Sequence, residues 1–201
     1  HRDAVIALAK AGKAVACTKP LGRNADEAAD MLRAVTEAGV FSAYLENVIF
    51  NPDLLRMRDM VEAGAIGRLT TVRAREGHSG PHAAHFWDAE LAGGGALLDM
   101  ASHGPECARY VFGKDLAVRE VFAWGDTLVH GDRTTGEDNA MMIMRFADGR
   151  AATVDVSWSS KGGLEGRFEA YGDAGRLITD ISVGSLKAFV ERPAGYLVEK
   201  A

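Results

Sequence analysis

The feature that most limits the possible folds is a change in hydrophobic pattern near Glu46. Before this residue, amphipathic helical patterns alternate with short apolar runs. From Arg68 onward, strand patterns follow one another with only one helical interruption. The first arrangement is typical of parallel sheets with crossover helices, and the second of antiparallel sheets with short turns. We therefore expect two architectures, over residues 1–45 and 46–201.

In the first 45 residues, the order helix, strand, helix, strand predicts the back end of a doubly wound, Rossmann-type α/β domain. The apolar run Ala14–Cys17 predicts a buried parallel strand, and Phe41–Leu45 predicts a second. Asn24 is expected to cap the helix between them, with Glu27 three residues on, and Gly39 to end it. The apolar positions that this helix is expected to bury are Ala28, Met31, Leu32 and Val35.

Residues 46–201 are expected to form a second domain of the α+β type. Helices are predicted from Asn51 to Gly64 and from about Ala96 to Phe112. Short turns such as Ala147–Gly149 separate the remaining runs, which favours a large, mostly antiparallel sheet. The expected strands are Arg68–Arg75, Val118–Trp124, Asn139–Phe146, Ala151–Ser159, Arg167–Tyr171, Leu177–Ile181 and Ser185–Glu191.

The helices are expected to cover one face of this open sheet. Met, Trp and Phe residues on the strands predict that the other face is a subunit interface, in a homodimer or homotetramer. The alternative is a solvated face with scattered apolar residues.

Composition is that of a globular protein with a core of normal size, at 47% hydrophobic and 25% charged residues. The net charge of −5 disfavours nucleic acid as a partner. Charged or turn residues break every apolar stretch well before the ~18 residues that cross a bilayer. The chain has two cysteines, Cys17 and Cys107, and no secretory pattern at its start. These features indicate a reducing, cytoplasmic location.

Lys19 and the pair Asp99 and His103 are the candidate catalytic residues. The segment Cys17–Pro20 presents Lys19 at the carboxyl end of a parallel strand, where open α/β sheets bind ligands. Asp99 and His103 are four residues apart, so on one helix face the carboxylate would orient the imidazole and favour its protonated form. The preceding Gly93–Gly95 lets backbone come close to a ligand or another strand. The alternatives are a surface loop at Lys19 and a structural ion pair in the helix.

Three histidines, His78, His82 and His85, precede the aromatic segment Phe86–Trp87. Their spacings of four and three would suit a metal on a helix, but Gly80-Pro81 predicts a loop, so no metal is expected. We interpret the segment as a loop in which His78, His85 and Trp87 line the substrate. A purely structural loop is the alternative.

No G-x-G-x-x-G motif occurs. The nearest candidate begins at Gly93 and has Leu98 in place of the last glycine, so no pyrophosphate site is predicted. The first residue, His1, stands at the head of a helical pattern, which indicates that sequence before it is missing.

Taken together, these segments resemble the Gfo/Idh/MocA oxidoreductase family over nearly the whole chain. Ala11–Pro20 is similar to the family pattern aGKhVlcEKPl, and Glu62–Leu69 is similar to i..G.iG.i. Gly93–His103 is similar to its glycine-rich segment ending in D-x-x-x-H. Thr18 stands where the family usually has Glu, and Glu106 stands where many members have Asp.

The resemblance implies a two-domain enzyme that holds NAD or NADP in a Rossmann domain and a sugar, sugar derivative or cyclitol in the sheet domain. Lys19 would contact substrate and nicotinamide, with Pro20 beside the cofactor. His103 would take the proton from a substrate hydroxyl while hydride moves to the nicotinamide ring. Asp99 would orient His103 and bind a neighbouring hydroxyl. The family's glycine-rich first βαβ unit does not occur in this sequence.

Three functions compete. The first is an NAD(P)-dependent dehydrogenase acting on a small polyol or sugar. The second is a nicotinamide-using glycosidase of similar architecture, which oxidises and re-reduces its sugar. The third is an inactive fragment that acts as a dimerisation or binding module, expected if the polypeptide starts at His1. The joint presence of Lys19, Asp99 and His103 favours an enzyme.

Overall fold

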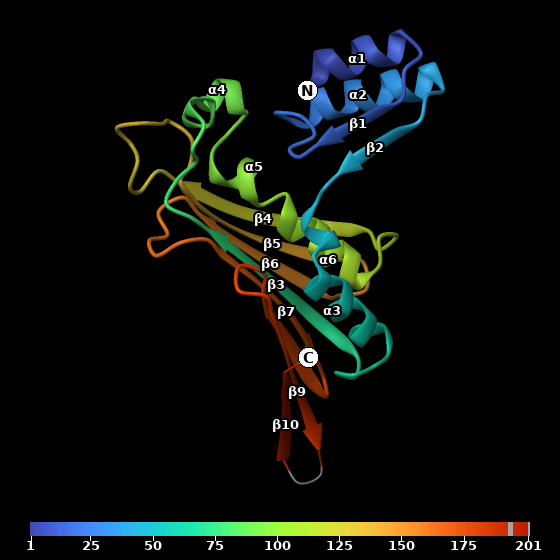
Figure 1. The fold of residues 1–201 in the computed structure, drawn as a ribbon, viewed down its shortest axis with the longest axis vertical. Coiled ribbons are helices and arrows are strands. Elements are labelled where there is room, and N and C mark those ends of the chain that lie inside the picture. The colour runs from blue at the N-terminus through green and yellow to red at the C-terminus, as the bar shows by residue number, and fades with distance from the viewer. Residues whose placement is uncertain (193–194, 201) are drawn as a thin grey trace.

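The first 45 residues form a small unit of two helices packed on two parallel strands, seen in blue in Figure 1. The computed structural model describes residues 1–192 and 195–200. In the parallel pair, Val15 lies opposite Ser42 and Thr18 opposite Leu45. The elements of this unit are α1 (Arg2–Lys10), β1 (Val15–Thr18), α2 (Ala25–Ala38) and β2 (Ser42–Leu45).

The ends of α2 follow the capping rules. The Asn24 side chain accepts a hydrogen bond from the Glu27 backbone N–H, and Gly39 ends the helix in the left-handed conformation. Met31 and Val35 are buried as predicted. The prediction for Leu32 is wrong, because this side chain is 66% exposed on the outer side of the helix.

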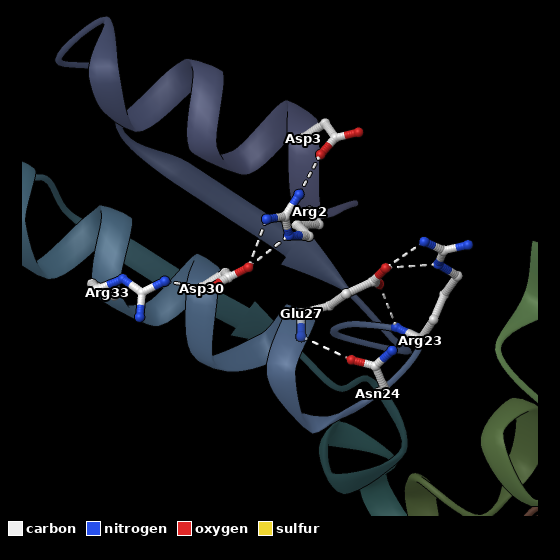
Figure 2. Close-up of polar contacts among 7 residues, drawn as sticks. All are labelled: Arg2, Asp3, Arg23, Asn24, Glu27, Asp30 and Arg33. Atoms are coloured by element: carbon white, nitrogen blue, oxygen red, sulfur yellow. Dashed lines mark hydrogen bonds and ion pairs between the residues drawn. The ribbon is translucent and has the colours of Figure 1, made fainter.

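Charged side chains connect α1 to α2 on the surface of the unit (Figure 2). The Arg2 guanidinium donates two hydrogen bonds to one Asp30 oxygen, at 2.8 and 2.6 Å. Just before α2, Arg23 donates its backbone N–H and its guanidinium N–H groups to the Glu27 carboxylate. These contacts fix the turn that follows Pro20.

The rest of the chain forms an eight-stranded sheet in the order β10-β9-β8-β7-β3-β6-β5-β4. Neighbouring strands are antiparallel except β3 and β6, which confirms the predicted, mostly antiparallel open sheet. The last strand was not predicted. The strands are β3 (Leu69–Gly77), β4 (Val118–Asp126), β5 (Asn139–Phe146), β6 (Ala151–Ser157), β7 (Glu165–Gly172), β8 (Gly175–Asp180), β9 (Ser185–Arg192) and β10 (Gly195–Lys200).

Helices cover one face of this sheet, as predicted, and Figure 1 shows them all on the same side. Helix α6 packs on β3 and β6, α5 on β5 and β6, and α3 on the β7–β9 side. Short 3₁₀ turns and α4 occupy the connections. The helical elements are η1 (Val48–Phe50), α3 (Pro52–Glu62), η2 (Ala84–Trp87), α4 (Ala89–Ala92), α5 (Ala96–Met100) and α6 (His103–Phe112).

The segment predicted as one helix from Ala96 to Phe112 is two helices, α5 and α6, separated by a turn at residues 101–102. Pro105 explains the break. It has no backbone N–H to donate to the carbonyl of Ala101, and its ring collides with a continuous preceding turn. Within the first turn of a new helix, the missing N–H costs little.

Helix α6 lies unusually close to the sheet at Gly104. A Cβ atom built there would stand 2.7 Å from both Val154 methyl groups and 3.2 Å from the Ala74 Cβ. Only glycine allows this approach, which brings the neighbouring His103 down onto the end of β3.

Two separate hydrophobic cores stabilise the chain. One comprises Val5, Ala9, Val15, Cys17, Met31 and Val35, and the other lies between the large sheet and its helices. The division into domains at residues 45 and 46 stays a prediction, which these two cores support. None of the helices in the described residues is long and apolar enough to span a membrane.

Candidate active site

Lys19 and Asp99 meet where the small unit touches the large one. Lys19 follows the last residue of β1, and its Nζ donates to the Asp99 backbone carbonyl at 2.5 Å and to Asp99 Oδ1 at 3.1 Å. Residues 80 positions apart are thereby joined, and the structure places Lys19 beside the glycine-rich segment as the sequence pattern suggests.

Asp99 is held as a carboxylate. Its Oδ2 accepts the Trp158 indole N–H at 3.1 Å, and His78 Nε2 lies 3.7 Å from the same oxygen. Burial opposes ionisation, but the nearby His78 imidazole, the Lys19 charge and the hydrogen bonds from Lys19 and Trp158 outweigh it. They lower the Asp99 pKa to about 2. The carboxylate therefore fixes the Lys19 ammonium in place at neutral pH.

The predicted pairing of Asp99 with His103 is wrong. The His103 Nδ1 hydrogen-bonds to the Glu46 carboxylate instead. The prediction assumed one helix through both residues, but the break at residues 101–102 turns them to different partners. Asp99 thus orients Lys19, and Glu46 orients His103.

Glu46 is suited to hold this imidazole. It is 2% exposed, and its two oxygens also accept the backbone N–H groups of Val48, at 3.0 Å, and Ile49, at 3.3 Å. Burial raises its pKa, but the bond from His103 and these backbone N–H groups reverse the effect, and the net shift is downward. Because a carboxylate only accepts, Nδ1 must donate to it. The other ring nitrogen, Nε2, is left to take a proton.

A third carboxyl, Glu76 on β3, lies in the electrostatic field of the same groups. Burial is the largest influence on it and raises its pKa to about 7, although the charges of His103 and Lys19 act in the opposite direction. The site therefore combines two carboxylates that stay ionised with one carboxyl that titrates near neutrality.

Sequence reasoning missed both Glu46 and Glu76, although each carries a signal. Glu46 directly follows β2, just as Lys19 directly follows β1, so the carboxyl-end rule points to both. Glu76 continues the alternation Val72, Ala74 on the helix-covered face of β3, where an apolar residue is expected.

Two of the three glycines before α5, Gly93 and Gly95, make close chain contacts. A Cβ at Gly95 would stand 1.9 Å from the Glu137 backbone oxygen, and one at Gly93 would stand 2.5 Å from the Arg23 Cβ. The Glu137 carboxylate in turn accepts the backbone N–H groups of Gly95 and Leu97, at 3.1 and 3.0 Å. Of the two predicted reasons for the glycines, close approach to other backbone is the one that these contacts show.

The segment from His78 to Trp87 is a loop ending in one 3₁₀ turn. His78 faces Asp99, as described above. Trp87 packs between Trp158 and His130, and the Arg133 guanidinium lies over its ring, 3.6 Å from the centroid. In the described residues, no group of three metal-ligating side chains is arranged to hold a metal ion.

A cleft of about 580 Å³ opens beside Lys19 and Pro20. Its other lining groups include Arg2 and Arg23 from the small unit and the exposed His85. The cleft thus joins the carboxyl end of β1 to the histidine loop. Of the predicted substrate-lining residues, His78 and Asp99 lie in the polar cluster and His85 in the cleft, whereas Trp87 supports the loop from within.

Comparison with known proteins identifies a matching family model and several related dehydrogenases. Residues 54–178 match the family model described as the GFO/IDH/MocA C-terminal domain. Myo-inositol 2-dehydrogenase of Thermotoga maritima is 33% identical over 184 residues, covering 90% of this chain and 53% of the relative. Levoglucosan dehydrogenase of Pseudarthrobacter phenanthrenivorans is 29% identical and covers 89% of this chain and 52% of its own. The chain thus spans about half the length of these relatives.

Solved structures show the same fold. A levoglucosan dehydrogenase in complex with NADH and L-sorbose superposes with a TM-score of 0.87 at 25% identity, over 100% of this chain and 58% of that one. GenD2 from gentamicin A biosynthesis, in complex with NAD, gives a TM-score of 0.83 at 31% identity, over 90% and 51%. The chain belongs to the GFO/IDH/MocA family.

Proposed function

We propose that this chain forms the substrate half and the nicotinamide edge of an NAD(P)-dependent dehydrogenase. The enzyme oxidises a hydroxyl, or reduces a carbonyl, of a sugar, sugar derivative or cyclitol by hydride transfer. The observation that carries the proposal is that the pairs Lys19–Asp99 and His103–Glu46 are held at the carboxyl ends of the neighbouring strands β1 and β2, with Lys19 lining the cleft. The names of the relatives, which include dehydrogenases of inositol and levoglucosan, support the substrate class.

The residues at the cleft fit the nicotinamide end of such a cofactor. Lys19 and Pro20 stand at the carboxyl end of β1, where open α/β sheets bind ligands, and Arg2 and Arg23 add positive charge at the rim. When bound, a nicotinamide accepts or supplies the hydride.

The residues of this chain position the substrate and move its proton. Lys19, held by Asp99, donates hydrogen bonds to the reacting oxygen and polarises it. His103 Nε2 takes the hydroxyl proton as general base, and returns it as general acid in the reverse direction. The Glu46 carboxylate at Nδ1 keeps the ring oriented and stabilises the imidazolium that forms.

Replacing His103 by Ala tests the proposal. In the intact protein, with myo-inositol or levoglucosan and NAD or NADP, turnover should fall ~10²–10⁴-fold because proton transfer is lost. His82→Ala, in the exposed part of the histidine loop, is the matched control and should leave turnover unchanged. Activity of His103→Ala within a factor of about three of wild type would contradict the assignment. Release of a leaving group without net reduced cofactor would favour the glycosidase instead.

We also propose that the uncovered sheet face joins subunits of a homo-oligomer. Cross-strand register places Phe122 opposite Ile143 and Trp124 opposite Met141, so all four exposed side chains share that face. A contiguous apolar surface of this kind favours a protein interface over solvent. The two cysteines, both free and buried, support the cytoplasm as its location.

A further inference from the structure

We propose that Glu76 is a substrate-binding residue whose carboxylate accepts a hydrogen bond from a second hydroxyl of the polyol, while the first hydroxyl faces His103. This inference rests on the proposed dehydrogenase function and assigns a further contact within the same site.

The position of Glu76 is the first reason. On β3 it follows Val72 and Ala74 on the face that the helices cover, and it lies between Val156 of β6 and Gly166 of β7. Only 9% of it is exposed. A carboxyl at such a place loses most of its hydration, so its presence requires a compensating partner.

The second reason is that no partner exists in the described part of the chain. The other buried acids near the helix-covered face each have several donors: Glu46 has His103 and two backbone N–H groups, and Asp99 has Lys19 and Trp158. Asp138 accepts three consecutive backbone N–H groups. In the described part of the chain, no hydrogen bond contributes to the shift of the Glu76 pKa, which comes from burial and neighbouring charges. Unpaired buried polar groups of this kind are uncommon and mark a place for a ligand or a water.

The third reason is what surrounds it. Lys19 contributes positive charge, as does His103 once it has taken a proton, while Glu46 and Asp99 contribute negative charge. The Cys107 thiol lies nearby on α6. Glu76 keeps an exposed fraction of 9%. It lies in the same buried cluster of charged groups as His103 and Lys19, the two proposed catalytic residues.

The chemistry of this space favours a hydroxyl as the ligand. The Lys19 ammonium disfavours a bound cation, whereas a second anion would meet three carboxyl groups. A neutral hydroxyl can donate to Glu76 at little electrostatic cost. Because the Glu76 pKa lies near 7, a hydrogen bond from such a donor is enough to make the carboxylate the favoured form at neutral pH. A polyol offers adjacent hydroxyls, one for His103 and one for Glu76.

The test uses the intact protein with NAD or NADP and whichever of myo-inositol and levoglucosan it turns over. In Glu76→Gln, the KM for the polyol should rise about tenfold, with kcat changed less than about threefold, because a charge-assisted hydrogen bond is weakened. Glu76→Asp keeps the charge but withdraws the oxygens, and should raise KM similarly. Glu169→Gln is the matched control, since Glu169 is equally buried in the adjacent strand β7 but contacts Arg167 and Tyr171.

Monodeoxy analogues of the same polyol identify the contact. One of them should bind wild type about tenfold more weakly than the parent, yet bind Glu76→Gln about as well as the parent does. If every analogue loses the same affinity in both proteins, or if KM is unchanged in the folded Glu76 variants, Glu76 touches no hydroxyl and the inference is wrong. If wild type turns over neither polyol, the proposed function itself fails, which the wild-type assay shows before any variant is made.

Discussion

Asp99 and Glu76 are both buried carboxyls of one site, yet their surroundings shift their pKa values in opposite directions. Around Asp99, donors from the loop, the β1 end and β6 overcome burial and lower its pKa to about 2. Around Glu76, where no donor reaches the carboxyl among the described residues, burial prevails and raises its pKa to about 7. The first region therefore supplies a fixed charge that positions Lys19, and the second supplies a group that can change its protonation. Divergent carboxyls of this kind are a recurring mark of sites that transfer protons.

Replacing Lys19 by Met should disrupt the first region most strongly. The variant removes the ammonium from Asp99 and from the reacting oxygen, so kcat should fall by about 10²–10³-fold, as when an oxyanion-stabilising donor is lost. Steady-state kinetics with NAD or NADP and a polyol measure this. Lys13→Met, in the surface turn before β1, is the control. Unchanged kinetics of Lys19→Met would remove Lys19 from the site.

The contrast between the two regions also depends on parts of the molecule that the sequence predicts unequally well. The continuous apolar run at residues 140–144, followed by the turn at residues 147–149, is typical of a short buried strand, and β5 agrees with the prediction to the residue. The sequence predicts one helix over Ala96–Phe112, and the break between α5 and α6 has Pro105 as its signal. That one turn decides which carboxylate orients His103.

Of the site, the sequence indicated Lys19, Asp99 and His103, because each lies in a motif with regular spacing. It did not indicate Glu46, which hydrogen-bonds to His103 from the end of β2, or Glu76, which lies on β3 in the electrostatic field of the site. Contacts between residues tens of positions apart leave no periodic signal. The helix break and these long-range contacts are therefore what the structure adds.

The pH dependence of stability offers a second way to separate the two regions. The folded-state pKa of Glu76 lies above its usual value of 4.5, so between about pH 4.5 and 7 the folded state holds a proton that the unfolded state has released. This group thus lowers the free energy of unfolding as pH rises through that interval, by about 3 kcal/mol in all. Asp99 behaves in the opposite way: its stabilisation is present above its usual pKa of 3.8 and is lost as pH falls toward 2.

In Glu76→Gln, the loss of stability between pH 5 and 7.5 should be smaller than in wild type by about 2 kcal/mol, because the titrating carboxyl is gone. Urea denaturation at several pH values measures the difference. The cost of burying the amide does not depend on pH. It would change the free energy of unfolding equally at every pH and leave the slope of that free energy against pH unchanged. Glu169→Gln should retain the wild-type slope. Parallel wild-type and Glu76→Gln curves would show that Glu76 has an ordinary pKa, and the contrast with Asp99 would disappear.

Glu46→Gln tests whether the Glu46 carboxylate orients His103 for proton transfer. The amide oxygen can still accept the Val48 backbone N–H, but the amide nitrogen replaces the oxygen that accepts from Ile49, so circular dichroism must first show that the variant is folded. What is lost is the negative charge at His103 Nδ1, and kcat should fall by about 10–100-fold, as for other residues that orient a functional imidazole. KM should change little, because Glu46 is a positioning residue enclosed behind His103 and does not face the cleft. Glu106→Gln is the control, because Glu106 lies on α6 with His103 but pairs with Arg109 and Lys114. An unchanged kcat for the folded Glu46→Gln variant would show that Glu46 does not orient His103 for proton transfer.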